Sequence, residues 1–316
     1  MNTTQRILFF TAFITSTLFS YYFIPNLQTA SSSEVNTLTQ DDLATITGNV
    51  QRPNGIAQAG TKLYIACSGD WTIYEIDLTT QTTITYIYGV RNSHTLLIDD
   101  TNDDEVTIYA PDFVQNSLLR VNPVRSPETI ATNLQGPWGI ASLNRDVFLI
   151  TSIDGDQILA VNKSGTVVPL VSGLRSPTGI AIKNDQAYFA NSGSARRAIE
   201  WIDLSEVEIT EVMESTSVET ELIPQPLVTG LQNVTSVVMG PDDLLYFAYS
   251  LGTRGVVGRV DPEVCVENGC TNDEVEIVLY TELTAPLAGL TISSDMMLYT
   301  HTMFRPEIYE ADLNEL

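Results

Sequence analysis

The most reactive side chains of this chain are its two histidines, His94 and His301, and its three cysteines. Imidazole nitrogen and thiolate sulfur are the ligands that Zn²⁺ prefers, and they also serve as acids, bases and nucleophiles. Cys265 and Cys270 flank the turn-forming stretch Val-Glu-Asn-Gly, so we expect a local disulfide in an oxidising compartment. Cys67 is then left over, either as a metal ligand or as a small buried apolar residue.

Positive charge is scarce, so the placement of the arginines carries information. Asp and Glu number 39 against 15 Lys and Arg, and the formal net charge is −24. Nucleic acid is therefore excluded as a partner, because phosphate binding needs a basic surface. An anionic membrane surface would also repel most of this acidic protein. The sequence contains no phosphate loop, dinucleotide fingerprint, Gly-x-Ser-x-Gly elbow or His-Glu-x-x-His motif.

The elements that must position these residues come from an internal repeat. Each copy reads as a small apolar strand, a polar turn, an aromatic-rich strand, a loop and a third strand ending in Asp or Asn. A further β-branched strand precedes each copy. Four short antiparallel strands per unit, repeated radially, are typical of an all-β, six-bladed β-propeller. The six copies begin at Pro53, Ser93, Pro137, Pro177, Val234 and Leu287.

The order of the strands predicts how the ring closes. The folded part begins with a fourth strand, Leu43 to Val50, and ends after a third strand, Ile308 to Leu313. The N-terminal strand can therefore complete the C-terminal blade, which removes exposed sheet edges. We expect the propeller to span residues 41–316, to follow a linker at 31–40, and to be a monomer.

The N-terminal segment indicates export. Arg6 precedes an uncharged apolar run from Ile7 to Ile24, and small residues follow around Ala30. Residues 1–30 are therefore expected to be either a cleaved signal peptide or a retained membrane anchor. Both alternatives place the propeller outside the cytosol, as a secreted, periplasmic or extracellular domain. Membrane contact would occur only through this segment.

The repeats resemble NHL repeats and the gluconolactonase/regucalcin group of six-bladed, TolB-like propellers. The resemblance rests on the Pro-x-Gly-Ile-Ala motif at Pro53, Pro137 and Pro177, followed by an aromatic strand, and covers roughly residues 40–314. It implies a metal-dependent hydrolase, lactonase or lyase, in which Asn54 matches a metal-binding position. An Asp that the family also uses is absent here. The divalent metal that this alternative requires would be held by Asn54, His94, Asn191 and His301.

The repeat places two rings of side chains at one end of the central channel. Within the propeller, the turns from the fourth strand of one blade to the first strand of the next lie on one face. The loops between the second and third strands of each blade lie on the same face, which we call the mouth face. The opposite insertion face carries the two long connections at residues 204–225 and 262–274. The first ring follows the motif proline: Asn54, His94, Trp138, Thr178, Thr235 and Ala288. The second ring ends the second strand: Cys67, Pro111, Thr151, Asn191, Tyr249 and His301.

Seven of the fifteen basic residues fall in loops of the mouth face, namely Arg52, Arg91, Arg175, Arg196, Arg197, Arg254 and Arg305. This placement predicts that the mouth binds an anionic small molecule, glycan or protein. The residues expected to contact the ligand are Trp138, Arg196, Arg197, Tyr249, Arg254 and Arg305. Two alternatives stay open, the metal-dependent enzyme and a structural module that binds through its acidic insertions.

Overall fold

The computed structural model describes residues 36–102, 105–217, 222–284, 286–303 and 305–316. The expected signal peptide or anchor at 1–30, and residues 31–35 of the expected linker, lie outside the described residues. Among the residues described, no helix combines the length and apolar character needed to cross a membrane.

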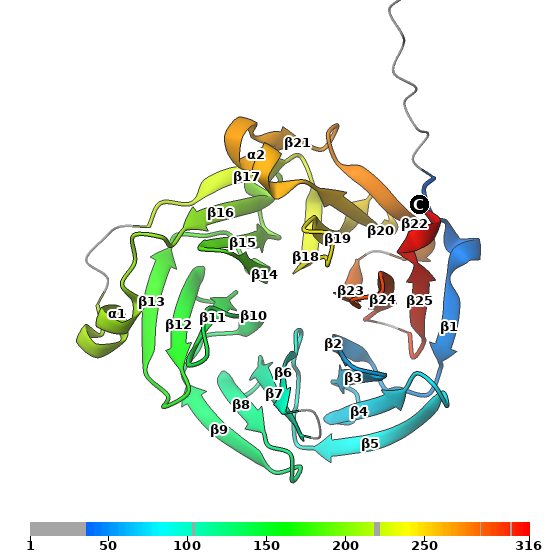
Figure 1. Cartoon of the computed structure of the whole chain (residues 1–316), viewed down its shortest axis with the longest axis horizontal. Helices are drawn as coiled ribbons and strands as arrows, with labels where there is room; N and C mark the ends of the chain where they lie inside the picture. Colours follow the sequence, from blue (N-terminus) through cyan, green and yellow to red (C-terminus); the bar gives the residue numbers. More distant parts are fainter. Residues whose placement is uncertain (1–35, 103–104, 218–221, 285, 304) are drawn as a thin grey trace, which may run out of the picture. The chain divides into compact units, whose positions relative to one another are not determined.

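Asn36–Leu316 form a six-bladed β-propeller, as predicted (Figure 1). Blade one consists of β2 (Pro53–Ala59), β3 (Lys62–Cys67), β4 (Thr72–Asp77) and β5 (Thr82–Tyr88). Blade two consists of β6 (Leu97–Asn102), β7 (Glu105–Asp112), β8 (Ser117–Val121) and β9 (Pro127–Thr132). Blade three consists of β10 (Pro137–Ser142), β11 (Val147–Ser152), β12 (Gln157–Asn162) and β13 (Val167–Ser172).

The remaining blades contain the irregular features. Blade four consists of β14 (Pro177–Lys183), β15 (Gln186–Asn191), β16 (Ile199–Asp203), β17 (Gln225–Thr229) and the short β21 (Cys270–Thr271). Blade five consists of β18 (Gln232–Met239), β19 (Leu245–Leu251), β20 (Arg254–Val260) and β22 (Glu276–Thr284). Blade six consists of β23 (Leu287–Ile292), β24 (Met297–Thr302), β25 (Ile308–Asp312) and β1 (Ala44–Thr47). Short 3₁₀ helices are η1 (Gln40–Asp42), η2 (Ala195–Arg197) and η3 (Leu313–Glu315).

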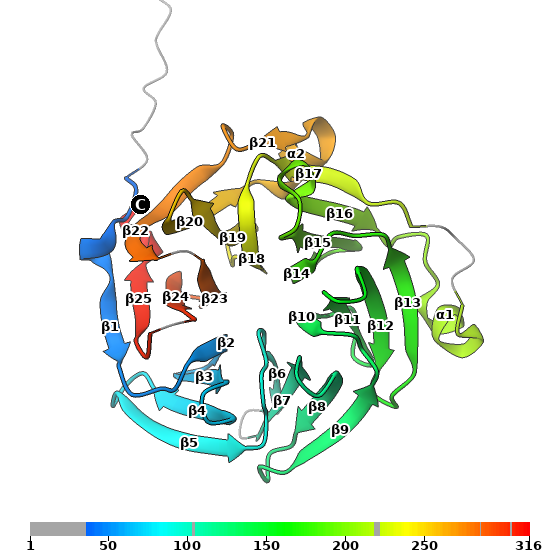
Figure 2. The ribbon, with the colours of Figure 1, turned by 180° about the vertical axis from the view of Figure 1, so that it is seen from behind.

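The ring closes through its N-terminal strand, and this prediction is confirmed. β1 pairs antiparallel with β25, with Ala44 opposite Glu310 and Thr47 opposite Ile308. Seen from behind, β1 again lies along the outer side of β25 (Figure 2). Residues 36–40, expected as linker, add a second closure: Leu38 is buried and pairs in parallel with β22 of blade five. Residues 36–47 therefore complete blade six through β1 and also contact blade five through Leu38.

The glycine of the Pro-x-Gly motif lies where two inner strands approach each other closely. A Cβ on Gly139 would lie 2.4 Å from the carbonyl oxygen of Thr178, and one on Gly179 would lie 2.3 Å from the nitrogen of Val237. In both cases the obstructing backbone belongs to the next blade. The motif is therefore a packing requirement of the ring, because any side chain here would push neighbouring blades apart.

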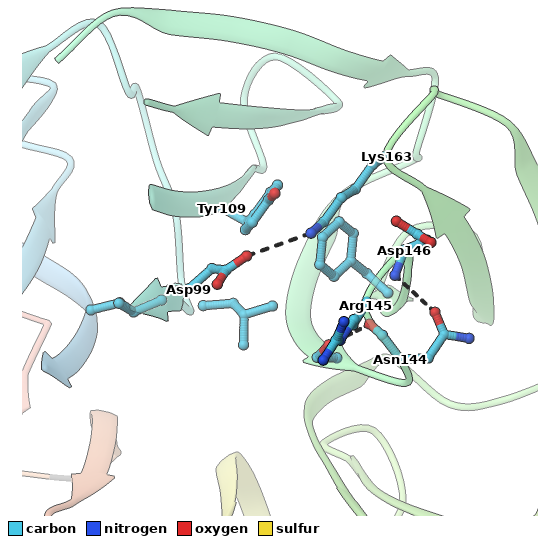
Figure 3. Close-up of a pocket in the computed structure, with 10 residues that line it drawn as sticks. Asp99, Tyr109, Asn144, Arg145, Asp146 and Lys163 are labelled. Atoms are coloured by element: carbon cyan, nitrogen blue, oxygen red, sulfur yellow. Dashed lines mark hydrogen bonds and ion pairs between the residues drawn. The ribbon is translucent and has the colours of Figure 1, made fainter. Parts of the chain in front are cut away.

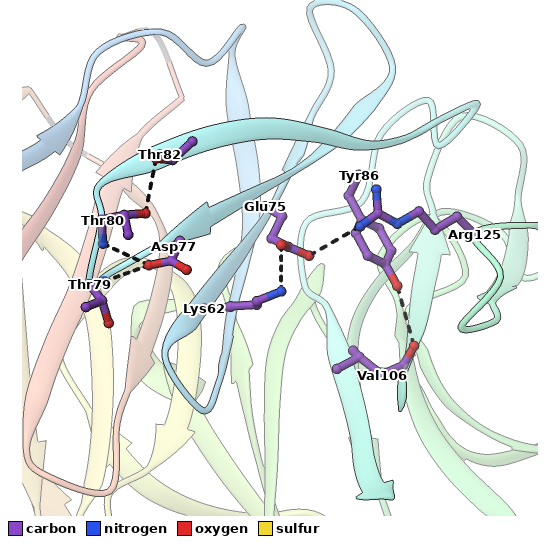
Figure 4. A network of polar contacts seen from close by, with 9 residues as sticks. All are labelled: Lys62, Glu75, Asp77, Thr79, Thr80, Thr82, Tyr86, Val106 and Arg125. Atoms are coloured by element: carbon purple, nitrogen blue, oxygen red, sulfur yellow. Dashed lines mark hydrogen bonds and ion pairs between the residues drawn. The ribbon is translucent and has the colours of Figure 1, made fainter. Parts of the chain in front are cut away.

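The hydrophobic core consists of clusters that each join two neighbouring blades. Phe189 of blade four packs with Leu149 of blade three, and Phe247 of blade five packs with Tyr188 of blade four. A polar contact joins blades one and two (Figure 4): the buried Glu75 carboxylate lies 2.8 Å from Lys62 Nζ and 3.9 Å from Arg125 Nη2. Stability therefore depends on contacts between blades.

Both long connections contain a helix. The connection from β16 to β17 contains α1 (Ile209–Ser215), and the connection from β20 to β22 contains α2 (Pro262–Asn268). The predicted disulfide between Cys265 and Cys270 is present, with Cα atoms 5.1 Å apart. It fixes the start of β21, which pairs in parallel with β17 and so links the blade-five insertion to blade four.

Candidate functional site

The first ring of predicted site residues makes contacts between blades one, two and three. Asn54 Nδ2 donates a hydrogen bond to Asn92 Oδ1 at 2.6 Å, and Asn92 Nδ2 lies 3.2 Å from His94 Nε2. The His94 ring stacks on Trp138, with ring centroids 3.4 Å apart. Phe113 packs edge-on against both rings. Asn92 and Phe113 are not among the site residues predicted from the sequence, although the sequence shows that Asn92 lies two residues before His94.

Hydroxyl groups continue these contacts around the axis. Thr151 Oγ1 donates to the carbonyl oxygen of Thr178 at 2.5 Å, and Thr178 Oγ1 donates to that of Val234 at 2.8 Å. Thr235 Oγ1 donates to the carbonyl oxygen of Leu287 at 2.6 Å. Blades three to six are thereby joined in sequence. The hydroxyl groups of Thr151, Thr178 and Thr235 are thus occupied by contacts between blades. By contrast, the buried Nε2 of His301 has no hydrogen-bond partner among the described residues.

The two histidines are buried and neutral at physiological pH. Burial, followed by the nearby charge of His301, lowers the pKa of His94 to about 3. Burial lowers the pKa of His301 to about 4, although the carbonyl oxygens of Thr302 and Asn54 oppose that change. A base with so low a pKa is a weak proton acceptor at neutral pH. General acid–base catalysis by these two residues is therefore disfavoured.

Two of the four residues predicted to hold a metal, Asn191 and His94, have other partners in the structure. Asn191 Oδ1 accepts a hydrogen bond from the backbone of Arg175, and Asn191 Nδ2 donates to Glu200. Its amide is therefore occupied within blade four. His94 contacts Asn92 and Trp138 instead of a metal-binding group. Across the described part of the chain, no three His, Cys, Asp or Glu side chains converge as metal ligands do.

Cys67 is buried at the inner end of blade one. Its pKa is raised to about 12, mainly by burial, so the thiol stays protonated. A protonated and buried thiol is a poor nucleophile and a poor metal ligand. Cys67 therefore packs as a small apolar residue, beside Ile65 and Ile308 in the cluster that joins blades six and one.

The predicted ligand-binding arginines fall into two groups. Arg197 binds the buried Glu200 carboxylate through Nε and Nη2, at 2.5 and 2.9 Å, and Arg254 pairs with Glu282 at 2.5 Å. Arg196 and Arg305 are exposed, and neither forms an ion pair within the described ranges. Arg52, Arg91 and Arg175 are exposed as well.

The aromatic residues of the mouth also differ in accessibility. Tyr249 is 5% exposed and packs in the core beside Phe247, so its ring is covered. Trp138 is half-buried, with one face against His94. Trp71 is 54% exposed, and the Arg91 guanidinium lies 5.4 Å from its ring centroid. Trp71 with Arg91 is thus the more accessible aromatic surface of the mouth face.

The central channel contains a cavity of about 240 Å³ with mainly apolar walls. Each inner strand contributes aliphatic side chains, including Ile56, Leu97, Ile140, Ile180, Val237 and Leu290. A wall of this kind does not activate water or stabilise a charged intermediate.

Comparison with known proteins supports the fold and leaves the activity open. No protein-family model matches the chain, and no curated protein sequence matches it. A gluconolactonase from Xanthomonas campestris superposes with a TM-score of 0.64 at 11% identity, covering 85% of this chain and 89% of that one. Regucalcin from Agrobacterium tumefaciens superposes with a TM-score of 0.62 at 11% identity, covering 87% of this chain and 95% of that one. Virginiamycin B lyase from Staphylococcus aureus superposes with a TM-score of 0.54 at 15% identity, covering 82% of this chain and 81% of that one. The resemblance to this group of propellers is confirmed at the level of the fold.

Proposed function

We propose that this protein is a binding propeller whose mouth face recognises an anionic small molecule, glycan or protein. The observation that carries the proposal is a set of exposed arginines on the mouth face of a chain with net charge −24. None of them forms an ion pair with a carboxylate among the residues that the structure describes. These five are Arg52, Arg91, Arg175, Arg196 and Arg305.

The physical basis of the proposal is the positive charge that these exposed guanidinium groups place on one face of an acidic protein. A local positive patch attracts anions from solution and orients them, and guanidinium groups bind carboxylate, sulfate or phosphate in a planar, bidentate manner. Trp71 adds a flat apolar surface beside Arg91. The preferred ligand therefore combines an anionic group with a ring that can stack on the indole, either an aromatic ring or the C–H face of a sugar.

The enzymatic alternative has less support. The fold matches include a gluconolactonase and a lyase, but likeness of fold does not carry activity. Both histidines have lowered pKa values, and the Cys67 thiol stays protonated. A structural module that binds through its acidic insertions remains the third alternative.

Binding should be measured with two probes, citrate as a small anion and dextran sulfate as a polyanionic glycan. The test variant is Arg196→Ser with Arg305→Ser, and the control is Arg120→Ser on β8, the third strand of blade two, where Arg120 pairs with Glu128. We expect the double variant to lose about a hundredfold or more in affinity, because each of the two charged hydrogen bonds contributes roughly 1.5–3 kcal/mol. Wild-type binding should also weaken as salt increases, because exposed charges are screened. Affinities that ignore both the substitutions and the salt would contradict the proposal.

The enzymatic alternative needs its own measurement. Metal content of the purified protein and hydrolysis of gluconolactone with added Ca²⁺ or Zn²⁺ address it directly. We expect no stoichiometric metal and no turnover. Metal-dependent turnover would overturn the proposal of a non-catalytic protein.

Export from the cytosol belongs to the same proposal. It is supported by the disulfide between Cys265 and Cys270 and by the apolar run of Ile7–Ile24. Cell fractionation and N-terminal sequencing of the mature protein test export and distinguish a cleaved signal peptide from a retained anchor.

A further inference from the structure

A separate cavity lies on the insertion face between blades two and three (Figure 3). Its volume is about 790 Å³, within the usual range of small-molecule sites. Its wall comes from β6, β7 and β11, from the turn between β10 and β11, and from Lys163 after β12. We call it the blade two–three pocket. It lies on the opposite face from the arginines of the proposed mouth function.

One wall of this pocket is held rigidly by an aromatic pair and a lysine. Tyr109 and Phe148 pack with ring centroids 4.5 Å apart. The Lys163 ammonium lies 5.6 Å from the Tyr109 centroid and 6.0 Å from the Phe148 centroid. Lys163 Nζ also lies 3.5 Å from Asp99 Oδ2, and the two side chains point toward one another (Figure 3). The lysine is therefore fixed between rings and carboxylate, so a ligand finds it already oriented.

The opposite wall is a turn that is fixed by its own hydrogen bonds. Asn144 Oδ1 accepts hydrogen bonds from the backbone nitrogens of Asp146 and Val147, both at 2.9 Å. Ser142 Oγ donates to the carbonyl oxygen of Asn144 at 2.8 Å. The turn leaves the side chains of Arg145 and Asp146 exposed along the pocket, and neither side chain has a hydrogen bond or ion pair within the described part of the chain.

The charges around the pocket balance. Arg145 and Lys163 are positive, whereas Asp99 and Asp146 are negative. A ligand that carries only negative or only positive charge would be attracted by two of these side chains and repelled by the other two. Hydroxyl groups fit this arrangement, because each donates one hydrogen bond and accepts others.

We propose that the blade two–three pocket binds a neutral polyhydroxylated molecule, namely a sugar or polyol. Its hydroxyls would donate to Asp146 and accept from Arg145 and Lys163. The aliphatic side chains of Leu97 and Ile98, which also line the pocket, would contact its C–H face. A second cavity of about 650 Å³ shares Asn144, Arg145 and Asp146 and reaches α1. The insertion of blade four thus extends the site for a ligand longer than one sugar unit.

Three probes with one ring skeleton test the charge argument: D-glucose, D-glucuronate and D-glucosamine. Each is titrated into the purified full chain carrying Arg196→Ser and Arg305→Ser, so that the proposed mouth site contributes little, and followed by ligand-observed NMR up to about 10 mM, well above a millimolar dissociation constant. We expect glucose to bind at least as tightly as either charged probe, with little dependence on salt. Binding of glucuronate alone, weakened by salt, would overturn the proposal in favour of an anion site. Absence of binding by all three probes would also overturn it.

Two variants locate the site. Arg145→Ala and Asp146→Ala should each weaken glucose binding about tenfold, because each removes a hydrogen bond to a charged group. Asp185→Ala is the matched control, since Asp185 is an exposed residue in the equivalent turn of blade four and does not line the pocket. Equal effects of Asp146→Ala and Asp185→Ala would contradict the assignment. The variant with Arg196→Ser and Arg305→Ser should bind glucose as tightly as the wild type. The pocket proposal and the proposed mouth function can therefore be refuted separately.

Discussion

The imidazole of His94 stacks on the indole of Trp138, with ring centroids 3.4 Å apart and planes within 4° of parallel. The stack joins blade two to blade three at the mouth of the channel. Residues that looked available for chemistry in the sequence are thus part of the contacts that hold the ring together. The same relationship explains why His94 is buried and why its pKa is lowered.

Trp138→Ala should lower the free energy of unfolding by about 2 kcal/mol, because it removes both the stack and the half-buried indole. Urea denaturation with a constant m-value is the appropriate measurement. Trp71→Ala is the control, since that exposed indole contributes little to packing, and a change below about 0.5 kcal/mol is expected. Similar losses for both variants would show that the stack does not stabilise the ring.

Acidification should destabilise the protein through its two histidines. Their folded-state pKa values, about 3 for His94 and about 4 for His301, lie below the unfolded value of 6.5. The unfolded chain therefore binds more protons below pH 6.5, so stability is fully present above that pH and is lost as pH falls toward 4. Each histidine should contribute a loss of about 2 kcal/mol between pH 7 and pH 5.

The measurement is urea unfolding at both pH values for the wild type, His94→Gln and His301→Gln. Between pH 7 and pH 5, the free energy of unfolding should fall less in each variant than in the wild type, whatever the variant's stability at pH 7. Parallel pH profiles would mean that these histidines are not buried as described.

Leu38→Ala should cost about 2–3 kcal/mol of stability, because this buried leucine attaches the chain start to blade five. Its backbone accepts a hydrogen bond from Tyr280 at 2.8 Å and donates one to Val278 at 3.0 Å. Thr45→Ala on β1 is exposed and should change stability by less than about 0.5 kcal/mol. Deleting residues 40–50 removes β1 and should prevent closure altogether. A deletion variant that melts like the wild type would refute this account of closure.

The native protein should contain no thiol that reacts with a thiol reagent, and unfolding should expose one. Cys67 is buried and protonated, and the other two cysteines form the disulfide. Replacing Cys265 and Cys270 by Ser should lower stability by about 2 kcal/mol, as expected for a short loop. Hydrogen exchange should then increase at β21 and β17, which the disulfide loop helps to pair. Fast reaction of a native thiol would contradict the burial of Cys67.

The repeat was readable from the sequence because its signals are local. Alternating apolar residues mark the strands, and the Pro-x-Gly motif marks the close approach of inner strands in three of the six blades. The closing strand followed from counting strands at the two ends of the chain. The disulfide was predictable because Cys265 and Cys270 flank a short turn.

The state of the candidate site was decided only by the tertiary structure. Whether an arginine can bind a ligand depends on whether the fold brings a carboxylate next to it. Arg254 pairs with Glu282, whereas Arg305 is exposed. The blade two–three pocket likewise combines Asp99 with Lys163, which the sequence separates by 64 residues. The sequence by itself determined the blades and their order, because these follow from local periodicity and steric demands. Which polar groups bind one another and which face solvent depends on contacts between blades, and these exist only once the ring has closed.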